Sequence, residues 1–280
     1  MLNKRTASRY LKPLKPIPTS LRKSGKPLTG IDCVLFDIYG TLLISASGDI
    51  SLSQNKEQPT GKIEDLIQKY RVESDPQTLM NALDQAIAAT HRFKKEQGIL
   101  FPEVEIDRIW MQVLNNPGRE FARKFAVEYE LTVNPVYPMP HLEELLQTCR
   151  SKKIRMGLIS NAQFYTPYLF KWLLDAAPED LGFHPHLIFL SYQMGVAKPS
   201  PELFQKAADA LNKMNIQTRA VLFMGNDMLN DILPAKRAGF KTALFAGDIR
   251  SLRLRKDDPR CQNLSPDIVL TDLNQLFEYI

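Results

Sequence analysis

The sequence alternates short, mostly apolar runs with segments of helical periodicity, and this alternation restricts the fold more than any other feature. The apolar runs lie at residues 34–36, 154–159, 187–190, 220–224, 242–245 and 267–270. Between them, apolar residues recur at helical spacing, as they do over residues 142–149 and 203–211. Strands that are apolar on both faces are typical of a parallel sheet covered by helices. We therefore expect an α/β fold with a mainly parallel sheet.

One long segment does not share this pattern. Over residues 49–136 the apolar residues follow helical spacing, at 63–70, 79–87 and 106–114, and no strand-like run is found. Turn-forming residues bound the segment, with Ser47 and Gly48 before it and Asn134 and Pro135 at its end. The sequence therefore predicts a helical domain over 49–136, inserted into a core formed by residues 30–48 and 137–280.

The positive charge of the chain is concentrated at its start. The net charge is +5, but residues 1–29 hold eight of the 36 lysines and arginines and no acid, which leaves 28 basic against 31 acidic residues, or −3, elsewhere. This distribution argues against a nucleic-acid surface on the core. Four prolines in residues 1–29 disfavour a helical transit peptide, so we expect a flexible basic extension.

Other features bear on the location of the chain. No apolar run approaches the roughly 18 residues of a membrane-spanning helix. The three cysteines are scattered and in no paired spacing, as expected in a reducing compartment. We therefore expect a cytoplasmic protein without a membrane span. The alternative that the basic extension directs the protein to an organelle stays open.

Polar residues follow the ends of several predicted strands. Asp37 comes directly after the first strand, Ser160 and Asn161 follow the second, and Lys198 lies beyond the third. Asp227 and Asp231 follow the run that ends at residue 224. Because ligands bind beyond the carboxyl ends of strands in open parallel sheets, we expect these residues to form one anion-binding hydrolytic site.

Four segments in this order resemble the sequence motifs of the haloacid dehalogenase superfamily of hydrolases. They are residues 36–42 (FDIYGTL), 157–161 (GLISN), 197–201 (AKPSP) and 224–231 (MGNDMLND). The resemblance covers residues 31 to about 275 and implies a Rossmann-like core, with the 49–136 insert in the place of a helical cap.

The resemblance and the residue chemistry together assign roles. Asp37 is the expected nucleophile, Ser160 and Lys198 are expected to hold the substrate anion, and Tyr39, Gly40, Thr41 and Asn161 are expected to contact substrate. Asp37, the Tyr39 carbonyl, Asp227 and Asp231 offer hard oxygen ligands suited to Mg²⁺. Structural alternatives exist for several of these residues: Ser160 could cap a helix, and Asp227 and Asp231 could stabilise a helix N-terminus.

Tyr39 departs from the phosphatase pattern. Phosphatases of the superfamily carry an aspartate acid-base two residues after the nucleophile, whereas a tyrosine resembles the subgroup that hydrolyses 2-haloacids. A phenol with a pKa of about 10 is a poor proton donor at neutral pH, and a departing halide needs no proton. We expect a magnesium-dependent phosphatase that acts on a small phosphorylated metabolite. The alternatives are a metal-independent 2-haloacid dehalogenase and a catalytically decayed scaffold that binds a partner.

A second basic run follows the strand expected at 242–245. It contains Arg250, Arg253, Arg255 and Lys256. A solvated loop, or one paired with the following Asp257 and Asp258, is the simpler interpretation, and contact with an anionic substrate or partner is the alternative.

Overall fold

The computed structural model describes residues 1–47 and 60–280. Its centre is a seven-stranded sheet in the order β1-β9-β8-β7-β2-β5-β6. All neighbouring strands pair in parallel except β1, which pairs antiparallel with β9. The strands are β1 (Ser24–Gly25), β2 (Cys33–Phe36), β5 (Arg155–Ser160), β6 (Phe183–Leu190), β7 (Val221–Gly225), β8 (Lys241–Phe245) and β9 (Ile268–Leu270). The predicted α/β class with a mainly parallel sheet is confirmed.

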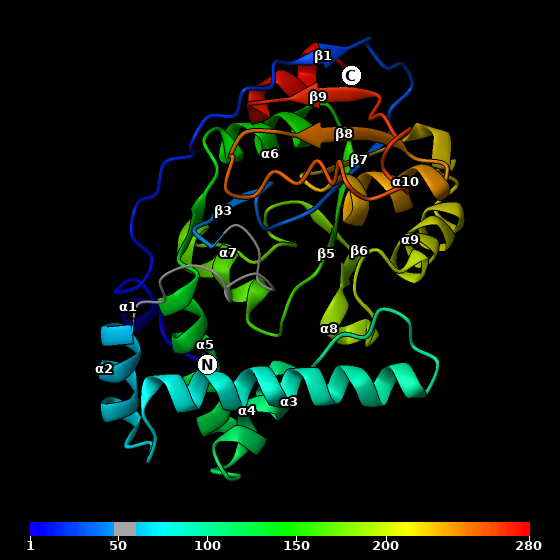
Figure 1. Ribbon diagram of the computed structural model, residues 1–280. Helices are drawn as coiled ribbons and strands as arrows, with labels where there is room; N and C mark the ends of the chain where they lie inside the picture. The colour runs from blue at the N-terminus through cyan, green and yellow to red at the C-terminus, as the bar shows by residue number, and fades with distance from the viewer. Residues whose placement is uncertain (48–59) are drawn as a thin grey trace.

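Helices cover both faces of this sheet (Figure 1). Residues of β2 alternate between two apolar clusters: Val34 and Phe36 pack with α6 and α7, whereas Cys33 and Leu35 pack with α9 and α10. This two-sided burial explains why the central strands are apolar throughout. The core helices are α6 (Leu142–Ser151), α7 (Thr166–Leu174), α8 (Ser191–Met194), α9 (Pro201–Lys213) and α10 (Leu233–Arg237), with short 3-10 helices η2 (Thr218–Ala220) and η4 (Leu273–Glu278) and a π-helical turn η3 (Met228–Ile232).

The described part of the predicted insert is helical. It contains α2 (Thr60–Tyr70), α3 (Pro76–Glu96), α4 (Ile106–Val113) and α5 (Arg119–Val133), with Trp110 and Phe125 packed together at its centre. A two-stranded antiparallel ribbon of β3 (Leu43–Ser45) and β4 (Val136–Pro138) joins the chain leaving the core to the chain returning to it. Gly48, just before the predicted insert, and the first residues of the insert, from Asp49 on, lie outside the described residues.

The basic N-terminal segment is bound to the rest of the molecule. After α1 (Lys4–Ala7) it extends along the molecule to the sheet edge, where it forms β1 (Figure 1). The Tyr10 hydroxyl donates to Glu128 of α5, Thr19 Oγ1 donates to the Ala246 carbonyl at 2.8 Å, and Lys23 pairs with Glu278. This differs from the flexible extension that we predicted, because acceptors supplied by distant parts of the core bind its donors. No helix among the described residues is both long and apolar enough to cross a membrane.

Candidate active site

Adjacent strand ends bring the predicted site residues to one edge of the sheet. Asp37 follows β2 directly, Ser160 is the last residue of β5, and Asp231 lies in η3 just beyond β7. Because β5, β2 and β7 are neighbours and run in parallel, their carboxyl ends meet at this edge. Lys198 reaches the same place from the loop between α8 and α9.

Lys198 is the hub of the hydrogen bonds in this cluster. Its Nζ donates to Asp37 Oδ1 at 2.6 Å and to Asp231 Oδ1 at 2.5 Å, and Ser160 Oγ donates to the same Asp37 oxygen at 2.9 Å. All of these side chains are buried, with 5% of Asp37 and 6% of Lys198 exposed. Two donors therefore fix one oxygen of Asp37, while no described residue hydrogen-bonds Oδ2.

The charge of Lys198 is maintained by its carboxylate neighbours. Burial by itself lowers the pKa of Lys198, but the negative charges of Asp231 and Asp37 raise the pKa above its ordinary value. Burial raises the pKa of Asp231. The positive charge of Lys198 lowers this pKa, and the negative charges of Asp37 and Asp227 raise it further. The ammonium thus stays protonated at neutral pH and gives the buried site a permanent positive charge.

The loop that presents Lys198 is held by Asn161 and by the start of α9. Asn161 Oδ1 accepts a hydrogen bond from the Lys198 backbone N–H at 2.7 Å, and its Nδ2 donates to the Lys198 carbonyl at 3.3 Å. Ser200 is the N-cap of α9 and Pro201 its first residue. Asn161, which we expected to contact substrate, therefore positions the lysine backbone.

The turn after Asp37 requires a glycine. Gly40 has φ of 80°, and a Cβ placed there would lie 2.4 Å from both the Asn226 side chain and Ser251 Cβ. Thr41, expected to offer its hydroxyl to substrate, is fully buried, and its Oγ1 has no hydrogen-bond partner within the part of the chain that the structure describes. The turn thus brings Ser251, in the loop after β8, against the loop that carries Asp37.

Tyr39 does not present a proton donor to the site. Its hydroxyl is hydrogen-bonded to Thr166 Oγ1 at 2.9 Å, at the start of α7. Burial raises the pKa of Tyr39 well above the ordinary value of 10.0, the Thr166 hydrogen bond opposes that shift, and nearby carboxylates add to it. The phenol therefore keeps its proton at any physiological pH, which agrees with our expectation that it is a poor acid-base group.

Two of the predicted magnesium ligands, Asp227 and Asp231, are engaged by other groups. Asp231 Oδ2 accepts the backbone N–H groups of Asn226 and Asp227 at 3.0 and 2.9 Å, and its Oδ1 accepts Lys198. Both oxygens of Asp227 accept from the Arg255 guanidinium, at 2.6 Å in the shortest contact. Within residues 1–47 and 60–280, no group of three or more His, Cys, Asp or Glu side chains could hold a metal ion. As arranged, these residues do not fit Mg²⁺, and the magnesium site stays a prediction.

Two hollows that share lining residues lie at this edge of the sheet. The smaller has a volume of about 60 Å³ and is lined by Asp37, Tyr39, Asn161, Lys198, Asn226, Asp227, Asn230, Asp231, Ser251 and Arg253. The larger, of about 500 Å³, lies between helices α3, α4 and α5 and the core loops, and shares Asn161, Lys198 and Asn230 with the smaller. The larger cavity offers space for a substrate whose reacting group reaches Asp37.

The larger cavity contains carboxyl groups with shifted titration. Glu130 accepts a hydrogen bond from Asn134 Nδ2 at 3.1 Å and one from the Tyr165 hydroxyl. Burial raises the pKa of Glu130 from 4.5 to about 7 against these two bonds. Burial also raises the pKa of Glu103 on the opposite wall. The larger cavity therefore holds two carboxyl groups that keep their protons to higher pH than exposed ones, beside the Lys198 that it shares with the smaller hollow.

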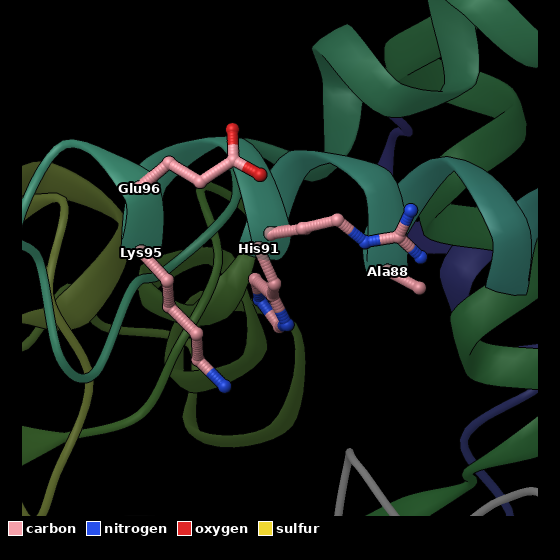
Figure 2. A pocket seen from close by; sticks show the side chains of 5 residues that line it. Ala88, His91, Lys95 and Glu96 are labelled. Atoms are coloured by element: carbon pink, nitrogen blue, oxygen red, sulfur yellow. The ribbon is translucent and has the colours of Figure 1, made fainter.

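A further depression on α3 lies on the surface. Figure 2 shows that His91 and Lys95 project from one side of the helix and Glu96 from the other. Of these side chains, only His91 also lines the larger cavity. The depression contains none of the predicted site residues.

The sequence interpretation missed the part of the site that comes from the loop after β8. Ser251 and Arg253 line the smaller hollow, and Arg255 pairs with Asp227. A signal was present: in residues 251–255 (SLRLR), polar and apolar residues alternate, and Leu252 and Leu254 pack against a small apolar cluster. The run of basic residues by itself favours a solvated loop and leaves contact with an anionic substrate or partner only as the alternative.

Comparisons with known proteins agree with this geometry. Residues 31–239 match the family described as haloacid dehalogenase-like hydrolase. The phosphoserine phosphatase of Thermus thermophilus is 27% identical over 175 residues, which are 61% of this chain and 63% of that protein. The glyceraldehyde 3-phosphate phosphatase of Pyrococcus abyssi is 29% identical over 107 residues, 38% of this chain and 42% of that protein. The match thus spans less than two thirds of either relative.

Solved structures share the fold. A 2-haloacid dehalogenase from Pseudomonas syringae superimposes with a TM-score of 0.58 at 18% identity, covering 89% of this chain and 97% of that one. An L-2-haloacid dehalogenase superimposes with a TM-score of 0.51 at 17% identity, covering 90% and 99%. The family match spans the central strands of the α/β sheet and includes the strand-end cluster of Asp37, Ser160 and Lys198. The chain belongs to the haloacid dehalogenase-like hydrolases.

Proposed function

We propose that the protein hydrolyses a small phosphorylated substrate through a covalent intermediate on Asp37. The observation that carries the proposal is the position of this carboxylate. Lys198 and Ser160 hold Oδ1 at 2.6 and 2.9 Å, Oδ2 has no hydrogen-bond partner among the described residues, and the side chain lines a hollow. A carboxylate held in this way is oriented for in-line attack on a substrate placed in the hollow.

The reaction has two displacement steps. An oxygen of Asp37 attacks phosphorus, the bond to the leaving oxygen breaks, and an acyl phosphate forms on the side chain. Water then attacks this phosphorus, inorganic phosphate departs and the carboxylate is restored. The Lys198 ammonium, which bonds directly to Asp37, stabilises negative charge on the phosphoryl oxygens in both steps. Aspartyl nucleophiles of this kind are an established form of covalent catalysis.

The nature of the leaving group follows from Tyr39. Because burial keeps the phenol protonated and the bond to Thr166 turns it to α7, this side chain gives no proton to a departing oxygen. General acid catalysis contributes typically about 10²–10⁴-fold, so alkyl phosphates would react slowly. We therefore propose substrates with a good leaving group, such as acyl or aryl phosphates. The curated relatives, which are named phosphatases, support the phosphoryl class.

The sequence also predicted that magnesium takes part. Asp227 and Asp231 are bound to Arg255 and Lys198, so no step of the proposed reaction is assigned to a metal. The same arrangement favours a second candidate, displacement of halide from a 2-haloacid by Asp37, which needs neither a metal nor a proton donor at Tyr39. In that reaction the carbon-halogen bond breaks, an ester forms on Asp37, and water hydrolyses the ester.

Parallel assays distinguish the candidates. Release of p-nitrophenol from p-nitrophenyl phosphate, of phosphate from acetyl phosphate and of chloride from 2-chloropropionate would be measured with and without EDTA. Asp37→Asn should abolish turnover, whereas Asp32→Asn, at an exposed carboxylate before the same strand, should leave it unchanged. Phosphate release that depends on Asp37 supports the proposal, and chloride release alone supports the second candidate. Turnover that survives in Asp37→Asn would refute both.

A further inference from the structure

The loop after β8 is built into the site by backbone hydrogen bonds. The Arg253 N–H donates to the Asn226 carbonyl and the Met228 N–H donates to the Arg253 carbonyl, both at 2.9 Å. Asn226 Nδ2 donates to the Ser251 carbonyl at 2.7 Å. Ser251 and Arg253 are therefore fixed beside the loop that carries Asp227, and both line the hollow around Asp37.

Arg255 uses the hydrogen-bonding capacity of Asp227. Its guanidinium contacts both carboxylate oxygens, and the backbone N–H groups of Leu229 and Asn230 donate to Oδ1 at 2.8 and 3.1 Å. A carboxylate has about four acceptor positions, and these donors fill them. Asp227 is only 5% exposed, whereas the Arg255 side chain that covers it is 30% exposed.

Among the described residues, cations and carboxylates at this edge of the sheet are equal in number. The carboxylates are Asp37, Asp227 and Asp231, and the cations are Lys198, Arg255 and Arg253, whose Nη1 also donates to the carbonyls of Arg250 and Leu252. Guanidinium groups stay charged in proteins and bind the oxygens of carboxylates and phosphates. The two arginines together carry the same charge as one Mg²⁺ ion.

The hollow also contains a buried hydroxyl that lacks a partner. Ser251 is fully buried, and within the part of the chain that the structure describes its Oγ has no hydrogen-bond partner. Buried polar groups are usually hydrogen-bonded, and an unsatisfied one costs about 1–3 kcal/mol. A ligand oxygen in the hollow would satisfy it.

We propose that Arg253 and Arg255 take the place of a divalent cation in this site. Arg255 neutralises Asp227, and Arg253 and Ser251 bind the oxygens of a tetrahedral oxyanion beside Asp37. This inference deepens the proposed function and takes the identity of the anion from it. The binding of phosphate and its independence from metal ions do not rest on the proposed function.

Two binding measurements on the wild-type protein test the inference directly. Electron paramagnetic resonance should show no stoichiometric binding of Mn²⁺ at millimolar concentration. Calorimetry should show that inorganic phosphate binds with the same affinity in EDTA and in Mg²⁺. Stoichiometric Mn²⁺ binding, or phosphate binding that EDTA abolishes, would overturn the inference.

Matched variants locate the effect. Arg253→Met should weaken phosphate binding about tenfold to hundredfold, as loss of a charge-assisted hydrogen bond does. Arg260→Met removes an arginine that pairs with Asp258 in the same region and should leave phosphate binding unchanged. Equal affinity in Arg253→Met and wild type would contradict the assignment of Arg253, and circular dichroism would establish that each variant is folded.

Arg255→Met provides a gain-of-binding test. Release of Asp227 from the guanidinium should allow Mn²⁺ to bind where the wild type binds none. If Arg255→Met binds no Mn²⁺ while it remains folded, Arg255 does not stand in the place of a cation and the inference is wrong. Absence of Asp37-dependent turnover would refute the proposed function alone, since these binding readouts do not require turnover.

Discussion

Replacement of Glu130 by glutamine should stabilise the protein at alkaline pH and have little effect at acid pH. Glu130 lines the larger cavity, and burial raises its pKa from 4.5 to about 7. The folded protein therefore binds more protons than the unfolded chain between these values, so the stability of the wild type falls as the pH rises through this range. Glutamine does not titrate and removes this loss.

The size of the effect follows from the two pKa values. Each tenfold change in acid dissociation corresponds to about 1.4 kcal/mol, so the displacement of the Glu130 pKa from 4.5 to about 7 corresponds to about 3 kcal/mol. Asn134 and Tyr165 both donate to the carboxylate of Glu130. The glutamine side chain has only one acceptor oxygen, so the variant loses about one of these two hydrogen bonds. We therefore expect a net gain of about 2 kcal/mol above pH 8, after loss of about one hydrogen bond.

Urea unfolding at pH 5 and at pH 8.5 measures this difference. Glu120→Gln is the matched control, because Glu120 lies on the same helix α5, is exposed and has its pKa lowered by its hydrogen bond with Lys124. The control should show no gain at alkaline pH. The reasoning is refuted if the stability difference between Glu130→Gln and the wild type is the same at both pH values.

Further expected outcomes concern the turn after Asp37 and the buried core. Gly40→Ala should lower the free energy of unfolding by about 2–4 kcal/mol, measured in urea, because the new Cβ meets two side chains at 2.4 Å and φ is positive. Gly98 also has a positive φ but has nothing within 4 Å of the new Cβ, so Gly98→Ala should cost only about 1 kcal/mol. Burial raises the pKa of Cys33 and Cys149 to about 12, so both thiols should resist iodoacetamide at pH 8 until urea unfolds the chain, as peptide mapping would show. Tyr39→Phe should leave the turnover of aryl phosphates unchanged and cost about 1 kcal/mol of stability, and a large loss of turnover would assign a chemical role to the phenol.

The sheet could be predicted from local sequence because its central strands are buried on both faces. In β2, both Val34 and Leu35 are fully buried, which yields an unbroken apolar run that few other structures require. Strands β1, β3 and β4 were not found in this way: each has only two or three residues and pairs antiparallel, outside the parallel centre of the sheet. They are defined by partners that are distant in sequence, as the pairing of Ser24 with Val269 shows.

The N-terminal segment illustrates the same limit. Its lysines and prolines are typical of a solvated extension, and no local periodicity indicates a partner. Its attachment depends on isolated acceptors that the fold brings together, such as Glu128 for Tyr10 and the Ala246 carbonyl for Thr19. Single donor–acceptor contacts of this kind, made outside the regular pairing of the sheet, leave no local pattern in the sequence.

The site was predictable where its residues follow strands, and not where another loop folds back on it. Asp37, Ser160 and Lys198 were found because strand ends of a parallel sheet converge. The spacing of Asp227 and Asp231 indicated that a cation binds there. Spacing alone cannot distinguish a metal ion from the side chain of a lysine or an arginine. Arg255, 28 positions beyond Asp227, reaches it by the turn after β8.

Tyr39 and Arg255 restrict the chemistry of the site in the same direction. The Tyr39 hydroxyl holds its proton against Thr166, so this position protonates no departing group. Arg255 gives Asp227 a counter-charge that is covalently part of the chain. Fixed cations stabilise charge on a bound anion, but they do not compensate for a missing acid at the leaving group. Selectivity among substrates should therefore depend first on how readily the leaving group departs as an anion. The size and lining of the larger cavity should then limit which of these leaving groups can enter.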